Sequence, residues 1–177
     1  MRLAIYILFA AVASACATLP QPANIPQYSV VTRDDEFRGG TLVAMHHNFL
    51  PSAPGEPNIA VGAARIRLAP PDSAVYLWII DSYGGEWTLM GNNEPLTFLV
   101  DDQRIRFDPM EASQRSLGRD GKVVERGIYL ATAVDIRRVA NGSVVRVRIG
   151  GRTLAIERTM GAENIGRLRA FVRQHLG

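Results

Sequence analysis

The segment Val145–Glu157, which reads VRVRIGGRTLAIE, indicates the fold of this chain most directly. Apolar and polar residues alternate on both sides of Gly150-Gly151, and this period of two is typical of β-strands with one buried face. Two consecutive glycines suit a tight hairpin turn because both can adopt a positive φ. The pairs expected about that turn are Ile149 with Arg152, Val147 with Leu154, and Val145 with Ile156. The apolar side chains then share one face, so the segment predicts an antiparallel hairpin.

Residues 96–107 predict a second hairpin of the same kind. Apolar side chains recur at every second position on both sides of Asp102-Gln103, which is the expected turn. The expected pairs are Val100 with Ile105 and Phe98 with Phe107. This pairing leaves Arg104 and Arg106 together on the opposite, polar face.

Further strands are expected earlier in the chain. Ala74–Asp81 is continuously apolar, which suits a central strand buried on both faces, and Glu86–Met90 is its expected partner. Gly40–Leu50 and Asn58–Ala69 predict two long strands joined by a proline-rich loop. The alternation of the second strand changes phase at Gly62–Ala64, as a β-bulge would cause.

Few segments predict helices. Ala133–Ala140 predicts a short helix, although a strand is a competing interpretation. Residues 163–176 predict an amphipathic C-terminal helix, because apolar residues recur there at three- and four-residue spacing. Its apolar face is expected to cover the sheet, and binding to a partner or a membrane surface is the alternative.

The order of these segments predicts the fold class. Val124–Ala131 adds another strand, and short turns follow one another without regular strand–helix alternation, which disfavours a parallel α/β fold. We expect a mainly β domain over residues 28–177, an antiparallel sheet or sandwich built from consecutive hairpins and capped by one C-terminal amphipathic helix. From Phe98 onward, the order of elements resembles a recurring, uncharacterised type of small bacterial envelope β domain.

The first residues are typical of an export signal. A positively charged start precedes the apolar run Leu3–Ala13, which is too short for a permanent membrane span and suits a signal peptide. The following Ala13-Ser14-Ala15-Cys16 resembles the lipobox of bacterial lipoproteins, with Ala13 where leucine is usual. The resemblance implies removal of residues 1–15 and lipidation of Cys16. Ordinary cleavage to a soluble periplasmic or secreted protein is the alternative.

The residues after the lipobox indicate in which membrane the protein would be anchored and how its domain would be held away from that membrane. Ala17 stands where aspartate tends to retain such proteins in the inner membrane, so the resemblance implies an outer-membrane lipoprotein that faces the periplasm. Residues 16–27 would form the lipidated N-terminus and a tether. Thr18–Gln27 contains three prolines and no charge, which excludes a helix or central strand and favours an extended spacer.

Composition excludes several classes of protein. The 177 residues are 47% hydrophobic and 21% charged, which excludes a long disordered tail and a polytopic membrane protein. The net charge of +3 is too small to indicate nucleic-acid binding. A single cysteine excludes an internal disulfide and a thiolate zinc site. We expect no cofactor. We also expect no metal site, because adjacent His46 and His47 on a strand would point to opposite faces.

Three Arg-x-Arg doublets share one spacing, which places both guanidinium groups of each doublet on one face of a strand. They are Arg65 with Arg67, Arg104 with Arg106, and Arg146 with Arg148. Neighbouring strands would combine them into a basic face for an anionic envelope component or a protein partner. The alternative is that they are ordinary solvent positions paired with acidic residues.

Trp78, Tyr83 and Trp87 are candidates for a ligand pocket, because two of them flank a flexible Ser-Tyr-Gly-Gly turn. Core and turn packing is the competing interpretation. The sequence has no Gly-x-Ser-x-Gly motif and no phosphate-binding glycine loop, so no catalytic residue is assigned. We therefore expect a membrane-anchored, non-enzymatic binding or scaffolding module. A ligand-binding or stress-sensing domain is the first alternative, and an enzyme acting on envelope material is the second.

Overall fold

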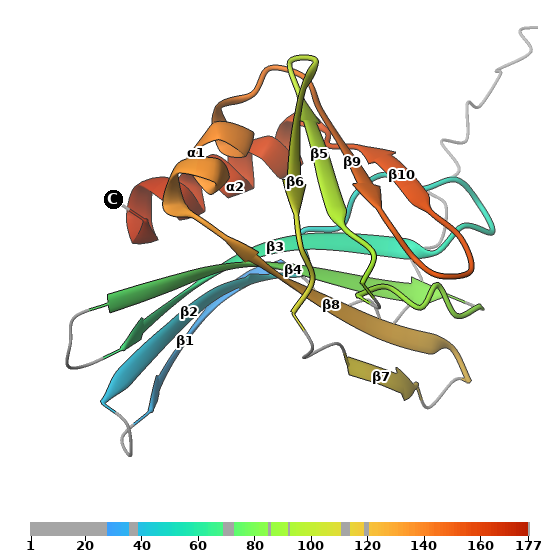
Figure 1. The fold of residues 1–177 in the computed structure, drawn as a ribbon, viewed down its shortest axis with the longest axis horizontal. Helices are drawn as coiled ribbons and strands as arrows, with labels where there is room; N and C mark the ends of the chain where they lie inside the picture. Colours follow the sequence, from blue (N-terminus) through green and yellow to red (C-terminus); the bar gives the residue numbers. More distant parts are fainter. Residues whose placement is uncertain are drawn as a thin grey trace, which may run out of the picture.

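The computed structural model describes a β-rich domain with two helices packed at one end (Figure 1). The described residues are 28–35, 39–68, 73–84, 86–91, 93–110, 114–118 and 121–176. The predicted signal peptide, Cys16 and the predicted tether lie outside them.

The strands form two antiparallel sheets, which confirms the predicted mainly β fold of consecutive hairpins. The six-stranded sheet has the order β1 (Ser29–Asp35), β2 (Gly40–His46), β3 (Asn58–Leu68), β4 (Ser73–Gly84), β8 (Val123–Ala131), β7 (Gln114–Leu117). The four-stranded sheet has the order β10 (Ile156–Thr159), β9 (Val145–Ile149), β5 (Leu96–Val100), β6 (Gln103–Phe107). The inner faces of the two sheets enclose one hydrophobic core.

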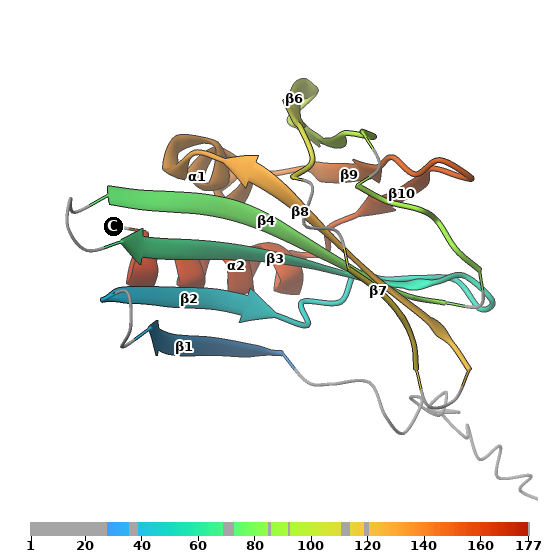
Figure 2. The same ribbon diagram turned by 60° about the horizontal axis from the view of Figure 1, so that its bottom comes forward.

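Both predicted helices are present, as α1 (Ala133–Asn141) and α2 (Ala162–His175). The hydroxyl of Thr132 accepts a hydrogen bond from the backbone N–H of Asp135, which caps the start of α1. Figure 2 shows α2 behind β2 and β3, so it covers the inner face of the larger sheet. At its start, the buried Asn164 amide donates to the carbonyl of Phe49 at 2.7 Å and to Asn48 at 3.0 Å.

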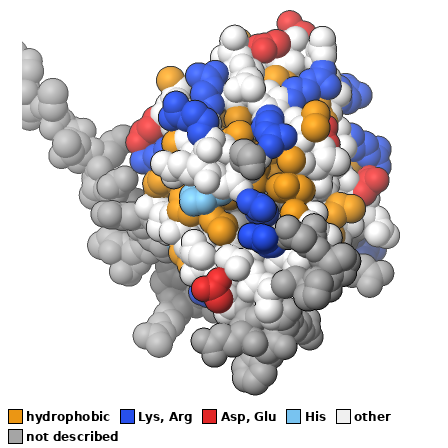
Figure 3. Space-filling model, turned by 90° about the vertical axis from the view of Figure 1, so that its left-hand side faces the viewer, with side chains coloured by type: hydrophobic (Ala, Val, Ile, Leu, Met, Phe, Trp, Pro, Cys, Tyr) orange, Lys and Arg blue, Asp and Glu red, His pale blue; other side chains and the backbone are white. Residues whose placement is uncertain are grey.

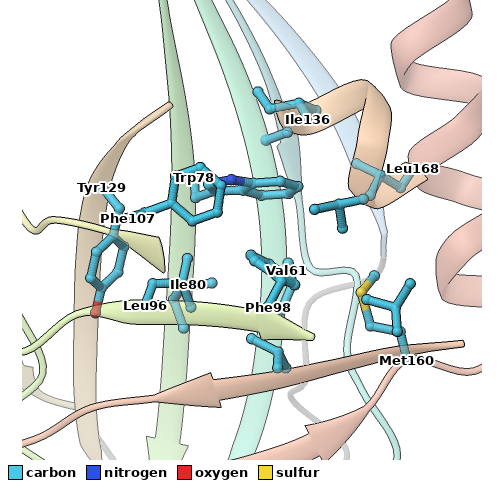
Figure 4. Close-up of a cluster of buried hydrophobic side chains, with 14 of the residues drawn as sticks. Val61, Trp78, Ile80, Leu96, Phe98, Phe107, Tyr129, Ile136, Met160 and Leu168 are labelled. Atoms are coloured by element: carbon cyan, nitrogen blue, oxygen red, sulfur yellow. The ribbon is translucent and has the colours of Figure 1, made fainter. Parts of the chain in front are cut away.

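Aromatic side chains fill the centre of the core. The ring of Trp78, a fully buried residue, lies 4.7 Å from that of Phe98 and 6.0 Å from that of Phe107, centroid to centroid. Figure 4 shows the indole between residues of both sheets, with Ile136 of α1 beside it. Nearby, burial raises the pKa of Tyr129 to about 12, so this phenol stays protonated at neutral pH.

The predicted register of the last hairpin is wrong. Ile149 pairs with Ile156 and Arg148 with Glu157, so the connection is a six-residue loop and not a two-residue turn. Neither Gly150 nor Gly151 has a positive φ. A Cβ on Gly151 would lie 2.3 Å from the carbonyl oxygen of Thr88. The glycines therefore permit close approach of another segment, and a tight turn does not form.

The second hairpin also differs from its prediction. The turn is Asp101-Asp102, with φ of +47° and +65°, and the pairs are Phe98 with Ile105 and Leu96 with Phe107. The carboxylate of Asp101 accepts hydrogen bonds from the backbone N–H groups of Val144 and Ser143, which hold this turn against the chain before β9 and lower the pKa of Asp101. Because the shift is two residues along β6, the apolar side chains remain on one face.

The bulge lies on the strand next to the predicted one. β3 pairs with β4 without interruption from Asn58 to Leu68. On the other side of β3, Ala44 pairs with Ala64 and Phe49 pairs with Ala60. Between these two pairs, the β2 side has one residue more than β3, so the bulge belongs to the β2 side. His47 takes up this residue with a φ of +58°. A Cβ on Gly62 would lie 2.2 Å from the carbonyl oxygen of Met45, so the glycine in β3 makes room for the bulge.

The predicted central strand is β4, whose partners are β3 and β8 and not Glu86–Met90. Its inner residues Trp78 and Ile80 are fully buried in the core. On its outer face, Leu77 joins a second, smaller cluster with half-buried aliphatic neighbours. β4 was predicted to be buried on both faces. Its inner face is fully buried and its outer face is partly buried.

Candidate functional site

Two of the three arginine doublets lie on the outer face of the four-stranded sheet. On β6 and β9, Arg104 and Arg146 both pair with Leu99 of the intervening strand β5. In the next outward-facing row, Arg106 and Arg148 both pair with Thr97. We call Arg104, Arg106, Arg146 and Arg148 the arginine face. Strand alternation aims all four side chains away from the core, because the residues between them are buried apolar ones.

An open groove of about 710 Å³ runs over this face. Other residues of the groove come from the same sheet and from the loop between β2 and β3, namely Glu56, Thr97, Leu99, Val147, Glu157, Arg158 and Thr159. Sequence reasoning missed these residues as groove lining. Only the last hairpin's actual register places Glu157 and Thr159 beside Arg148 and Arg146.

The four arginines differ in their acidic partners. Arg148 Nη1 lies 2.6 Å from Glu157 Oε1, and Arg106 Nε lies 3.4 Å from Asp108 Oδ1. Both pairs are exposed, so each contributes little to stability. Within the described residues, Arg104 and Arg146 form neither an ion pair nor a hydrogen bond. The Leu99 row of the face therefore carries uncompensated positive charge.

The third doublet is elsewhere, so the six arginines do not form one face. Arg65 pairs with Tyr76 of β4 and lies on the inner side of the larger sheet, beneath α2. Its Nη1 donates to the carbonyl oxygen of His175 at 2.9 Å, which satisfies a free carbonyl at the helix C-terminus. Arg67 follows on the same side of β3.

Several other arginines are also used inside the fold. Arg169 donates to the carbonyls of Ala140 and Gly142 at the end of α1. Arg126 binds the buried carboxylate of Asp81 through two hydrogen bonds of 2.6 and 2.9 Å. Part of the arginine content therefore has a structural role.

Basic side chains also occur away from the arginine face. Figure 3 shows the end of the molecule that carries the C-terminus, where Lys and Arg side chains are scattered among apolar ones. Any binding test of the arginine face therefore needs a control that removes the same charge elsewhere.

The three aromatic candidates do not line one pocket. Trp78 is buried in the core, whereas Tyr83 lies on the opposite face of β4, with its ring 5.6 Å from that of Phe49. Burial raises the pKa of Tyr83, and the nearby carboxylate of Asp81 adds to this effect. Trp87 is 37% exposed in a loop after β4. We therefore assign no ligand pocket to these residues.

The histidine pair differs from its prediction because His47 is not in the strand. β2 ends at His46, and the positive φ of His47 brings the two rings to 5.7 Å, centroid to centroid. Burial lowers the pKa of His46, with a further contribution from the Arg126 guanidinium. Among the described residues, no three His, Cys, Asp or Glu side chains are grouped to hold a metal ion.

Comparison with known proteins finds no matching family model, no matching curated protein and no matching solved structure. In the described part of the chain, neither helix has the length and apolar character needed to cross a membrane.

Proposed function

We propose that this protein is a non-enzymatic binding module of the bacterial envelope that holds an anionic envelope component on the arginine face. The observation that carries this proposal is the convergence of four arginines around one groove, two of them without an acidic partner. A guanidinium group is always charged and offers a planar fork of donors that matches phosphate and carboxylate oxygens. Paired strands hold the Cα atoms of the four arginines in a fixed arrangement, so binding has to order only their side chains.

Replacing all four residues of the arginine face by glutamine is expected to weaken binding of inorganic pyrophosphate about 100-fold or more. The variant loses four guanidinium groups and their four charges, but no buried group. Isothermal titration at fixed ionic strength measures the affinity, because charge effects depend on salt. The matched control replaces four exposed arginines elsewhere, namely Arg33, Arg138, Arg152 and Arg173. An equal loss in both variants would mean that net charge, and not this face, determines binding.

The proposal includes attachment to the outer membrane, facing the periplasm, through lipid on Cys16. Its support is the lipobox-like sequence and the proline-rich segment that follows it. Several acyl chains at one cysteine give a lasting anchor, whereas one chain binds only reversibly.

Cells labelled with a radioactive or clickable fatty acid are expected to label the wild-type protein, and the Cys16→Ser variant is expected to carry no label. The reason is that Cys16 is the single thiol in the chain. Fractionation of outer and inner membranes then locates the labelled protein. Label that persists in the variant would exclude the lipoprotein, and unlabelled wild type in a soluble fraction would indicate a secreted or periplasmic protein.

A further inference from the structure

We infer that the arginine face binds one compact dianionic phosphoryl group, held between Arg104 and Arg146 above Leu99. This inference rests on the proposed function and narrows it to one row of the face and one class of ligand. The phosphoryl group would come from a phosphate monoester, either a phosphorylated sugar or a phosphorylated lipid headgroup.

The geometry favours a ligand between these two residues. Arg104 and Arg146 both pair with Leu99, so their Cα atoms are two strand spacings apart, about 10 Å. Arginine side chains are long enough to lean toward each other over the intervening strand and meet at one group. At the end of the same row, Thr159 pairs with Arg146 and offers a hydroxyl donor.

The charges favour a phosphoryl group. Two guanidinium groups without acidic partners match the two negative charges of a phosphate monoester, and a carboxylate would compensate only one. The three terminal oxygens of the phosphoryl group can accept from both forks and from the hydroxyl of Thr159. The half-buried side chain of Leu99 provides an apolar floor for the carbon atoms next to the phosphate.

The acidic residues in and beside the neighbouring row limit the site to a compact ligand. Glu157 already holds Arg148 at 2.6 Å, and Asp108 lies 3.4 Å from Arg106. A long polyanion that crossed both rows would approach these carboxylates and be repelled by them. The two rows therefore have equal numbers of arginines but different roles, and only the Leu99 row accepts an anion.

The test compares two double variants that remove the same charge. Arg104→Gln/Arg146→Gln is expected to weaken binding of glucose 1-phosphate about 100-fold, roughly tenfold for each arginine. Arg106→Gln/Arg148→Gln is expected to change it less than about threefold, because these arginines are already neutralised. Isothermal titration at constant salt measures both, and circular dichroism verifies the fold of each variant. Equal losses in the two variants would overturn this inference.

A third variant tests the role of the carboxylate by a gain of binding. Glu157→Gln releases Arg148 and is expected to raise the affinity for pyrophosphate several-fold, because a third free guanidinium becomes available beside the first two. An unchanged or lower affinity would contradict the proposed difference between the rows.

Two ligands distinguish the sources of the phosphoryl group. Glucose 1-phosphate and short-chain dihexanoyl phosphatidic acid carry the same monoester, so both are expected to bind and to lose affinity in Arg104→Gln/Arg146→Gln. Tighter binding of the phosphatidic acid would assign the site to a lipid headgroup, and tighter binding of the sugar phosphate to a phosphorylated saccharide. Binding of pyrophosphate without either monoester would overturn this inference but leave the proposed function intact. Wild-type protein that binds none of the three would overturn both.

Discussion

Replacing Trp78 with alanine is expected to lower the free energy of unfolding by about 4 kcal/mol. The residue is fully buried, and its ring packs against Phe98 and Phe107 of the opposite sheet. Removing it leaves a cavity where both sheets and α1 meet, and rigid strands cannot close such a cavity. Urea unfolding followed by circular dichroism measures the change. The midpoint urea concentration is expected to fall, while the dependence of the free energy of unfolding on urea concentration stays similar.

The matched control is Trp87→Ala, because this tryptophan is 37% exposed in a loop. It is expected to change the free energy of unfolding by less than about 1 kcal/mol. Comparable losses in both variants would contradict the position of Trp78 in the core.

Replacing Glu125 with glutamine is expected to lower the free energy of unfolding by about 3 kcal/mol. This residue is almost fully buried on β8, and its carboxylate accepts from the backbone N–H groups of Thr88 at 2.6 Å and Leu89 at 2.8 Å. The side chain of Arg115 lies 3.5 Å away. An amide has one acceptor oxygen, so its NH₂ group would face a backbone donor. Removing the charge also removes the ion pair between Glu125 and Arg115.

Urea unfolding measures this loss, and hydrogen exchange at Thr88 and Leu89 locates it. Both N–H groups are expected to exchange faster in the variant, because their acceptor is weakened. The control is Glu157→Gln, whose side chain is 65% exposed and is expected to change stability by less than about 0.5 kcal/mol. Unchanged exchange at Thr88 and Leu89 in Glu125→Gln would contradict the role of this carboxylate in holding the loop.

These two effects concern the fold, whereas the arginine face lies outside the core. Its four side chains are exposed, and the strands that carry them are fixed by buried residues such as Phe98 and Val147. Substitutions on the face are therefore expected to change binding and leave stability nearly unchanged. This separation makes the paired arginine variants informative.

The candidate site was partly predictable. Alternation placed Arg104 with Arg106, and Arg146 with Arg148, on the outer side of their strands, because the buried residues between them are apolar. Nothing in the sequence indicated that β5 lies between β6 and β9, so the grouping of these two doublets was visible only in the structure. The doublet of Arg65 and Arg67 has the same spacing but lies on the inner side of another sheet.

The sequence by itself determined most of the strands, the C-terminal helix and the apolar side of both predicted hairpins, but it did not predict β1 or β7, and Glu86–Met90 is not a strand. The correct predictions were possible because alternation of period two and the spacing of a helix are local patterns. Tertiary structure alone decided the register of both hairpins, the strand that carries the bulge and the acidic partner of each arginine. The physical reason is that these features depend on contacts between distant segments, such as Gly151 against Thr88 and Asp101 against Val144. The residues next to a position in the sequence do not indicate which distant residues it will contact.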